Sequence, residues 1–347
     1  MVLLDSEHSS NKQVKMSEFW SGKKVLVTGA GGFIGSHLTE ALCSAGAQVR
    51  AMIRYNSRSD WGCLEELSGE HRSQLEVIAS DIADPFAVDA AVEGCDTVFH
   101  LAALIGIPYS YVAPESYVRT NITGTLNVLQ AARRYGTRRV IQTSTSETYG
   151  TAQYTPIDEL HPLVGQSPYS ASKIGADQMA LSFFRSFETP VVVLRPFNTF
   201  GPRQSARAVI PTIISQLASS GSLTLGSLDP VRDFLYVKDT ARGFMAAAEA
   251  GKQAEGEVIN VGTGQSVTIG ETAAMIGELM GVETGIKLHA ERIRPAKSEV
   301  MELVCNADKA KRLMDWSSQI SFKNGLQETI DYIVANLHRF KPEVYNV

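Results

Sequence analysis

Two groups of residues near the middle of the chain could do acid–base chemistry together. Tyr169 and Lys173 are four positions apart, so on a helix they would lie on one face. An ammonium beside a phenol favours the phenolate, so the pKa of the tyrosine is expected to fall from about 10 toward the working pH. A tyrosine tuned in this way can take a proton from a substrate hydroxyl. This spacing is common on helices, so the interpretation needs support from elsewhere in the chain.

The second group is Thr145, Ser146 and Glu147, which follow the apolar run Val140–Ile141. That run predicts a parallel strand, and the carboxyl ends of such strands face the ligand crevice in open α/β sheets. One segment would therefore offer two hydroxyls and a carboxylate, and the helix after it would offer a base. Taken alone, Glu147 would be interpreted as a solvated loop carboxylate.

A nucleotide-binding signature far upstream supplies the support. The chain reads T-G-A-G-G-F-I-G between a predicted strand, Lys23–Val27, and a predicted helix from Ser36 to about Ala45. Backbone N–H groups at such glycines can approach a pyrophosphate, and the helix N-terminus adds partial positive charge. The order strand, glycine turn, helix predicts dinucleotide binding, the alternative being a turn that only packs helix on strand. The predicted cofactor contacts in the turn are Gly29, Gly32, Phe33, Ile34 and Gly35.

The ends of the next strands supply further predicted cofactor contacts. After the second strand, Gln48–Ile53, Arg54 stands where an acid would bind the NAD ribose. This favours NADP, although an arginine can also stack on adenine. Asp81 is expected to accept a hydrogen bond from the adenine amino group, or else to cap a helix. The other contacts expected here are Ile82, Leu101 and Ala102, together with Tyr169 and Lys173.

Strands alternate with helices along this part of the chain, which predicts an α/β fold with a doubly wound parallel Rossmann sheet. Residues 21–200 are expected to form the dinucleotide-binding domain, with 233–262 returning to it. Residues 201–232 and 263–347 would form a smaller C-terminal α/β lobe for the substrate, and 1–20 a mobile tail. Asn121 opens a predicted helix reaching Arg134, either as a buried residue that holds a backbone bend or in a catalytic role.

Composition narrows the class of protein. The net charge is −5 with a pI near 5.9, which argues against a general nucleic-acid binder. The cysteines are scattered without a C-x-x-C pair, so we expect reduced thiols and no metal site. With no long apolar run and no signal-peptide core, the protein is expected to be cytoplasmic and not membrane-bound.

Taken together, these residues resemble the extended short-chain dehydrogenase/reductase family of NAD-dependent epimerases and dehydratases. The resemblance runs from Lys23 to about Leu326. It is carried by the motifs T-G-A-G-G-F-I-G, H-L-A-A, S-T-S-E-T-Y-G, Y-S-A-S-K, R-P-F-N-T-F-G-P-R and R-D-F-L-Y-V-K-D. Members act on nucleotide-diphosphate sugars through a bound nicotinamide cofactor.

The resemblance also implies roles for particular residues. Thr145, Tyr169 and Lys173 match the catalytic triad of the family. The positions that match substrate-binding residues, chiefly those holding the diphosphate, are Asn198, Arg203, Arg232 and Arg294. Arginine suits a diphosphate because its planar fork pairs two oxygens at once. The alternative for these arginines is a set of surface ion pairs.

The residues after Thr145 favour a 4,6-dehydratase, which must take the C5 proton and expel the C6 hydroxyl. Glucose-type dehydratases usually carry Asp-Glu here, whereas this chain has Ser146-Glu147. That pair resembles the GDP-mannose dehydratases and the N-acetylhexosamine dehydratases of nonulosonate pathways, the latter more closely. Glu147 is the expected base, and either Glu147 or a relay through Ser146 would protonate the leaving hydroxyl.

Other functions remain open at this point. A UDP-glucuronate decarboxylase also carries Thr-Ser-Glu, and a 4-epimerase needs only the tyrosine and hydride transfer. A non-enzymatic NADP-binding sensor is a further alternative, although such relatives often lose the tyrosine or lysine. The substrate is expected to be a GDP- or UDP-linked sugar. The resemblance implies a homodimer, because relatives pair through the tyrosine helix and the helix before it. The residues that would supply apolar surface there, or else belong to the core, are Ile174, Met179, Leu181, Phe183 and Phe184.

Overall fold

The computed structural model describes residues 18–283, 285–288 and 300–340 of the chain. A seven-stranded sheet in the order β11-β6-β5-β4-β1-β2-β3 forms its centre, and every pairing in it is parallel. Its strands are β1 (Lys24–Thr28), β2 (Gln48–Arg54), β3 (Glu76–Ser80), β4 (Thr97–His100), β5 (Arg139–Thr143), β6 (Val191–Pro196) and β11 (Val258–Val261). The predicted α/β Rossmann architecture is confirmed.

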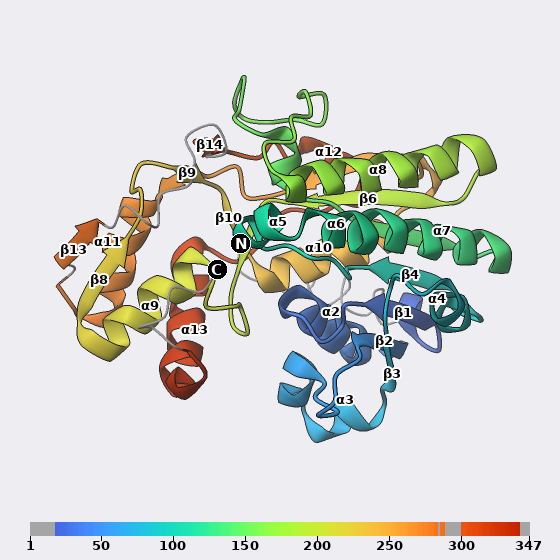
Figure 1. Ribbon diagram of the computed structural model, residues 1–347, viewed down its shortest axis with the longest axis horizontal. Coiled ribbons are helices and arrows are strands. Elements are labelled where there is room, and N and C mark those ends of the chain that lie inside the picture. Colours follow the sequence, from blue (N-terminus) through green and yellow to red (C-terminus); the bar gives the residue numbers. More distant parts are fainter. Residues whose placement is uncertain (1–17, 284, 289–299, 341–347) are drawn as a thin grey trace, which may run out of the picture.

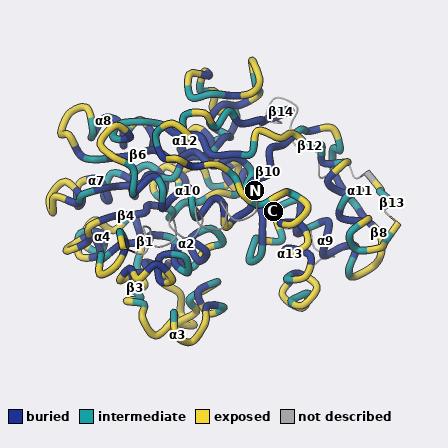
Figure 2. Tube along the Cα trace, turned by 180° about the vertical axis from the view of Figure 1, so that it is seen from behind, coloured by how far each residue is buried: buried dark blue, intermediate teal, exposed yellow. Residues whose placement is uncertain are grey.

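Helices cover both faces of this sheet (Figure 1). One face carries α2 (Phe33–Ser44) and α10 (Val237–Glu249), and the other carries α4 (Pro85–Val92), α7 (Gly124–Tyr135) and α8 (Pro168–Phe187). Strand β1 shows why: its side chains alternate between the faces. Val25 and Val27 pack with Leu38 of α2, whereas Leu26 packs with Leu129 of α7. The inner strands are accordingly buried, the edge strand β3 is partly exposed, and the outer sides of the helices are exposed (Figure 2).

A smaller lobe lies beside the central sheet, at the left in Figure 1. It contains α9 (Val209–Ser220), α11 (Ile269–Met280), α13 (Phe322–Ala335), β8 (Ser222–Leu225), β13 (Gly285–Leu288), β9 (Val231–Arg232), β12 (Val267–Thr268) and β14 (Glu302–Leu303). A two-stranded pair of β7 (Asn198–Phe200) and β10 (Phe234–Tyr236) lies between lobe and sheet. The domain boundaries given above remain a prediction, although β11 does pair with β6 of the central sheet.

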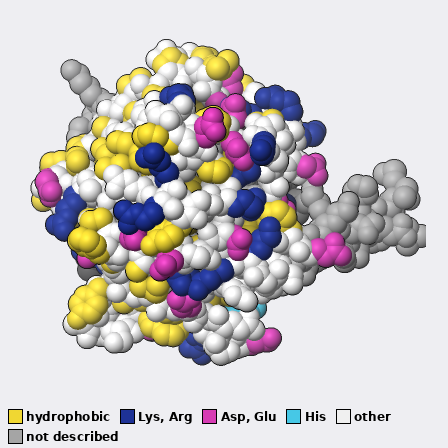
Figure 3. All heavy atoms as spheres, turned by 90° about the vertical axis from the view of Figure 1, so that its right-hand side faces the viewer, with side chains coloured by type: hydrophobic (Ala, Val, Ile, Leu, Met, Phe, Trp, Pro, Cys, Tyr) yellow, Lys and Arg dark blue, Asp and Glu magenta, His cyan; other side chains and the backbone are white. Residues whose placement is uncertain are grey.

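Shorter elements complete the described chain. They are η1 (Gly62–Glu66), α3 (Gly69–Ser73), α5 (Ile107–Val112), α6 (Pro114–Tyr117), η2 (Val118–Thr123), η3 (Ser146–Tyr149), η4 (Lys252–Ala254), α12 (Asp308–Met314) and η6 (Leu337–Arg339). Within the described ranges, no helix is both long and apolar enough to span a bilayer. On the face shown in Figure 3, basic and acidic side chains are intermixed.

Two expected elements differ in the structure. The run R-D-F-L-Y-V over residues 232–237 predicts one continuous strand, but the structure divides it into β9 and β10, which belong to different sheets. The break falls at Asp233, whose buried carboxylate accepts hydrogen bonds from the backbone N–H groups of Thr263, Gly264 and Cys305. The helix expected from residue 119 begins with a π-helical turn, η2, before α7.

The burial of particular side chains changes the expectations for the N-terminal tail and for the dimer surface. Residues 1–17 of the predicted tail lie outside the described residues, but Trp20 is fully buried, and its indole donates a hydrogen bond to Glu249. Of the apolar residues predicted for a dimer surface, Leu181 and Phe183 belong to the core between α8 and the sheet. They are therefore core residues of this chain, and dimerisation stays a prediction.

Candidate active site

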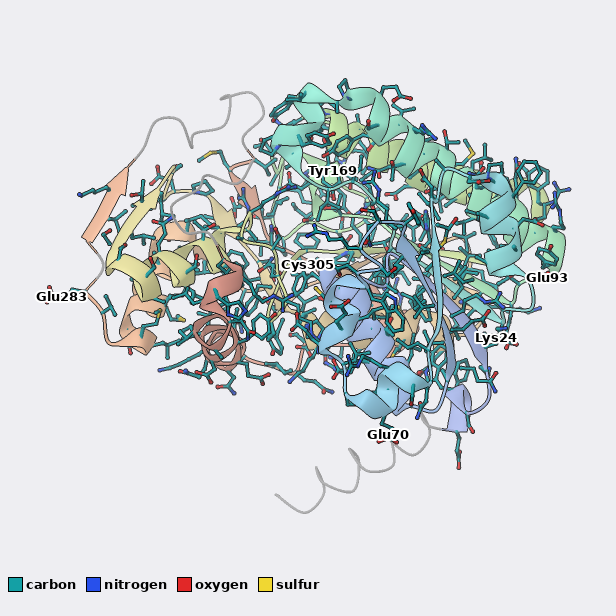
Figure 4. The ribbon with its side chains drawn as sticks, turned by 60° about the horizontal axis from the view of Figure 1, so that its bottom comes forward. Lys24, Glu70, Glu93, Tyr169, Glu283 and Cys305 are labelled. Atoms are coloured by element: carbon teal, nitrogen blue, oxygen red, sulfur yellow. The ribbon has the colours of Figure 1, made fainter. Side chains whose placement is uncertain are left out.

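The predicted catalytic residues lie where β5 ends and α8 begins. Thr145 precedes η3, and its hydroxyl accepts a hydrogen bond from the backbone N–H of Glu147 at 3.3 Å. Helix α8 starts at Pro168 because Ser167 and Ser170 form a capping box there. Tyr169 is therefore in its first turn, and helical periodicity buries it along one face together with Lys173, Ala176, Asp177 and Ala180. Figure 4 shows Tyr169 inside the molecule, on the side toward the smaller lobe.

The structure brings the side chains of Tyr169 and Thr145 close together. Tyr169 is 7% exposed, and this burial raises its pKa above the usual value for a phenol. The nearby Thr145 hydroxyl lowers the pKa, while the carboxylate of Glu147 raises it further. The expected fall in the pKa of Tyr169 is therefore wrong for this structure, because desolvation disfavours the phenolate more than its partners favour it.

Lys173 is 4% exposed, and its Nζ donates to the backbone carbonyl of Thr143 at 2.5 Å. Burial lowers its pKa to about 8, and the negative charge of Asp177 opposes that fall. The ammonium is thus bound by the carbonyl of Thr143 at the end of β5 and stabilised by the negative charge of Asp177 on its own helix. Its lowered pKa places a titration within the range in which the protein can be assayed.

Thr145, Ser146 and Glu147 differ in exposure. Thr145 and Glu147 are half-buried, whereas Ser146 between them is 2% exposed. The effect of the Glu147 charge on the pKa of Tyr169 shows that the two groups are close. The structure therefore gathers two hydroxyls, one carboxylate and one ammonium at the carboxyl end of the sheet.

The glycine turn after β1 has the close packing that a dinucleotide site requires. Gly29 has a φ of +70°, and an added Cβ there would lie 2.8 Å from the backbone nitrogen of Ala102. A Cβ on Gly35 would lie 2.2 Å from the carbonyl oxygen of Gly29. Gly32 is the N-cap of α2 and offers no side chain to the first N–H groups of that helix, which begins at Phe33. These residues, with half-buried Ile34, form a backbone cradle that fits a pyrophosphate.

The remaining predicted cofactor contacts lie at the ends of β2, β3 and β4. Arg54 is exposed at the end of β2. Asp81 is exposed and accepts from the backbone N–H of Ala83 at 2.9 Å, while Asp84 caps α4, so Asp81 is not the helix cap. The side chain of Ile82 is buried against α7. After β4, the N–H groups of Leu101 and Ala102 both donate to Thr28 Oγ1 at 3.1 Å.

The predicted substrate residues do not share one environment. The side-chain oxygen of Asn198 is buried without a hydrogen-bond partner among the described residues. Arg232 is 6% exposed and donates to the carbonyl of Val231. Arg203 instead forms ion pairs with Glu40 at 2.9 Å and Glu66 at 3.7 Å, so its predicted substrate contact lacks geometric support. Arg294 lies outside the described residues.

Several polar residues around the site were missed or left undecided. Asn121 in η2 donates to the carbonyl of Leu104 and to Ser172 Oγ, and it accepts from Leu104 N–H. It thus holds a backbone bend beside the catalytic helix. Asp177 and Arg195 form a buried ion pair of 2.8 Å that sequence reasoning overlooked. The available signal was an acid four residues after Lys173 and an arginine directly after the apolar run of β6. Within the described ranges no cluster of His, Cys, Asp and Glu could hold a metal ion.

Comparisons with known proteins agree with this geometry. A family model described as GDP-mannose 4,6 dehydratase matches residues 26–329. A dTDP-glucose 4,6-dehydratase of Actinoplanes sp. is 31% identical over 321 residues, covering 90% of this chain and 98% of that protein. UDP-glucuronic acid decarboxylase 1 of Xenopus tropicalis is 30% identical, covering 91% of this chain and 73% of that protein.

A solved dTDP-glucose 4,6-dehydratase from Streptomyces venezuelae, with NAD bound, superposes with a TM-score of 0.80 at 27% identity. The match covers 92% of this chain and 99% of that one. The family model spans most of the described chain, including the glycine turn, η3 and α8. The chain therefore belongs to the GDP-mannose 4,6-dehydratase family of extended short-chain dehydrogenases/reductases.

Proposed function

We propose that this protein is a nucleotide-diphosphate-sugar 4,6-dehydratase that makes a 4-keto-6-deoxy sugar nucleotide. The observation that carries the proposal is that Thr145 and the Glu147 carboxylate both lie close enough to Tyr169 to act on its pKa. A tyrosine–threonine pair can take the proton of a sugar carbinol while a nicotinamide cofactor would accept its hydride, but loss of water across C5–C6 also needs a second base. Glu147 is the half-buried carboxylate in the position to act as that base.

The residues that would hold a nicotinamide cofactor are the glycine turn, Leu101, Ala102, Tyr169 and Lys173. When bound, the cofactor supplies the acceptor for hydride from sugar C4 and the hydride that C6 later receives. We assign NAD rather than NADP, because the similar Streptomyces dehydratase contains NAD. This reverses the preference suggested by Arg54, whose exposed side chain also suits stacking on adenine.

The protein side chains then have distinct tasks. Tyr169 takes the proton of the C4 hydroxyl, Thr145 hydrogen-bonds the C4 oxygen, and the Lys173 ammonium favours the phenolate. The 4-keto group makes the C5 hydrogen acidic. Glu147 removes that proton and delivers it to the C6 hydroxyl, which leaves as water. C5 takes up a proton as C6 receives the hydride, which balances the proton that Tyr169 took from the C4 hydroxyl. We favour Glu147 over Ser146 for this delivery, because Ser146 is buried whereas Glu147 is half-buried beside Tyr169.

The smaller lobe is assigned to the sugar nucleotide. Asn198, with its unpartnered oxygen, and Arg232 at the edge of the lobe are the described residues that we expect to contact the diphosphate. The similar proteins act on dTDP- and UDP-linked sugars according to their names. A dTDP-linked sugar therefore joins the GDP- and UDP-linked sugars as a candidate substrate.

Two substitutions test the assignment of roles. Tyr169→Phe is expected to abolish turnover, since no group remains to take the C4 proton. Glu147→Gln is expected to permit C4 oxidation but to stop loss of water, seen by mass spectrometry as a keto species without a mass loss of water. The assignment of the base is wrong if Glu147→Gln dehydrates its substrate at a near-normal rate.

A further inference from the structure

A buried carboxylate that the proposed mechanism does not use lies one helical turn beyond Lys173. Asp177 is 1% exposed. Residues four apart on a helix share a face, so Asp177 and Lys173 both point from α8 toward the sheet. A buried carboxylate is costly unless charges and hydrogen bonds compensate it, so its position calls for a physical reason.

One oxygen of Asp177 joins the catalytic helix to the ends of two strands. Its Oδ2 accepts from Ser144 Oγ at 2.5 Å and from the guanidinium of Arg195 at 2.8 Å. Arg195 Nε in turn donates to Ser144 Oγ at 3.2 Å, which closes a triangle. Ser144 directly precedes Thr145, the partner of Tyr169. Asp177 therefore fixes the segment that carries Thr145 relative to the helix that carries Tyr169.

The other oxygen is unused by these contacts. Asp177 Oδ1 is buried and has no hydrogen-bond partner in the part of the chain that the structure describes. Arg195 does not compensate the burial of Oδ1, because it contacts only Oδ2, whereas a bidentate pair would have engaged both oxygens. Lys173 makes no direct ion pair with this oxygen, but it is a buried cation on the same helix face, and the negative charge of Asp177 raises its pKa.

We propose that Asp177 is a positioning residue that acts as the buried counter-ion of Lys173 and clamps the Thr145 segment to the catalytic helix. The inference rests on the proposed roles of Tyr169 and Lys173. It adds a residue that touches neither substrate nor cofactor and works through both catalytic groups.

The charges around Lys173 determine the sign of the expected effect. Among the charged and titratable groups around it, Asp177 from α8 and His100 from β4 interact electrostatically with Lys173. Glu147 from η3 acts on Tyr169, and Arg195 from β6 pairs with Asp177. Burial lowers the pKa of His100 to about 3, so it stays neutral in the range of interest. Asp177 raises the pKa of both Lys173 and Tyr169. Loss of its charge should therefore lower both pKa values.

The test is a titration of Lys173 by NMR in protein carrying ¹³C at lysine Cε, with the signal assigned through Lys173→Arg. An opposite charge nearby typically moves a pKa by about 1–3 units, so Asp177→Asn should lower the pKa of Lys173 by at least about one unit. Asp177→Glu keeps the charge and should restore most of the value. An unchanged pKa of Lys173 in Asp177→Asn overturns the proposal.

Ser144→Ala is the matched control, since it removes one corner of the triangle and keeps every charge. It should leave the pKa of Lys173 within about 0.3 units of the wild-type value, because an uncharged group is lost. If Asp177→Asn does not fold, the double variant Asp177→Asn/Arg195→Gln avoids an unpaired buried guanidinium and is compared with Arg195→Gln, which loses the same positive charge. The pKa of Lys173 should be lower in the double variant than in Arg195→Gln by at least about one unit. Equal pKa values in these two variants contradict the counter-ion role.

The NMR titration does not require turnover, so it distinguishes this proposal from the proposed function. If the protein dehydrates no sugar nucleotide but the pKa of Lys173 falls in Asp177→Asn, the proposed function fails and the counter-ion role survives. If turnover is found, the pH–rate profile of Asp177→Asn should move to lower pH by the same interval. A lower rate with an unshifted profile would reduce Asp177 to a purely structural residue.

Discussion

The pKa values at the site predict an unusual dependence of activity on pH. Burial raises the pKa of Tyr169 above its usual value and lowers that of Lys173 to about 8, so the lysine loses its proton first. The proposed active form has a phenolate and an ammonium. The phenolate–ammonium form carries the same number of protons as the form in which the tyrosine and the lysine are both neutral. Both forms therefore appear when the Tyr169–Lys173 pair has lost one proton.

The size of the expected change in kcat/KM with pH follows from the pKa of Lys173. The first proton leaves the pair with an apparent pKa of about 8, so kcat/KM should rise about tenfold per unit below that pH and level off above it. Between about pH 6 and about pH 8 the singly deprotonated fraction grows from roughly 1% to roughly 50%, an increase of about 50-fold. Kinetics of dehydration at low substrate concentration, in buffers of constant ionic strength, would measure it.

A substitution at the same position provides the control. An arginine does not deprotonate in this range, so in Lys173→Arg the first proton to leave belongs to Tyr169. The profile of that variant should keep rising through about pH 9 without levelling off, since the tyrosine pKa exceeds about 10. A wild-type profile that is flat between pH 6 and pH 8, or an identical plateau in Lys173→Arg, would refute the reasoning.

Other predictions concern the cradle, the buried ion pair and the triad hydroxyl. Gly35→Ala should weaken binding of NAD at least about tenfold by calorimetry, because the new Cβ meets backbone at 2.2 Å, whereas Gly69→Ala, with open space around it, should not. Arg195→Met should lower the free energy of unfolding by about 3–5 kcal/mol in urea, since it strands a buried carboxylate, while Arg134→Met at an exposed pair should cost under about 1 kcal/mol. Thr145→Val should reduce kcat by about 10²-fold or more with little change in cofactor affinity, and unchanged kcat would remove Thr145 from the mechanism.

The sequence was sufficient to predict features that depend on local periodicity and turn chemistry. The buried strand runs and the glycine turn predicted the parallel sheet, and the four-residue spacing placed Tyr169 and Lys173 on one face of α8. The direction of the Tyr169 pKa was wrong, because the spacing shows a lysine nearby but not how far the phenol is desolvated.

Features that depend on contacts between distant segments were not predictable in this way. Asp233 breaks the expected strand because it binds backbone of residues 263–264 and 305, far along the chain. The pairing of Asp177 with Arg195 and Ser144 likewise appears only after β5, β6 and α8 have packed. Arg203 looked like a phosphate ligand in its motif, yet it lies between two carboxylates.

The central claim is that this chain removes water from a sugar nucleotide without net redox change. The most direct measurement is mass spectrometry of UDP-, GDP- and dTDP-linked hexoses and N-acetylhexosamines, and of UDP-glucuronate, after incubation with protein and NAD. We predict loss of one water from one of these sugars, with the NAD/NADH ratio unchanged. Loss of carbon dioxide from UDP-glucuronate, or an isomer of unchanged mass seen by NMR, would contradict the account and establish a decarboxylase or a 4-epimerase instead.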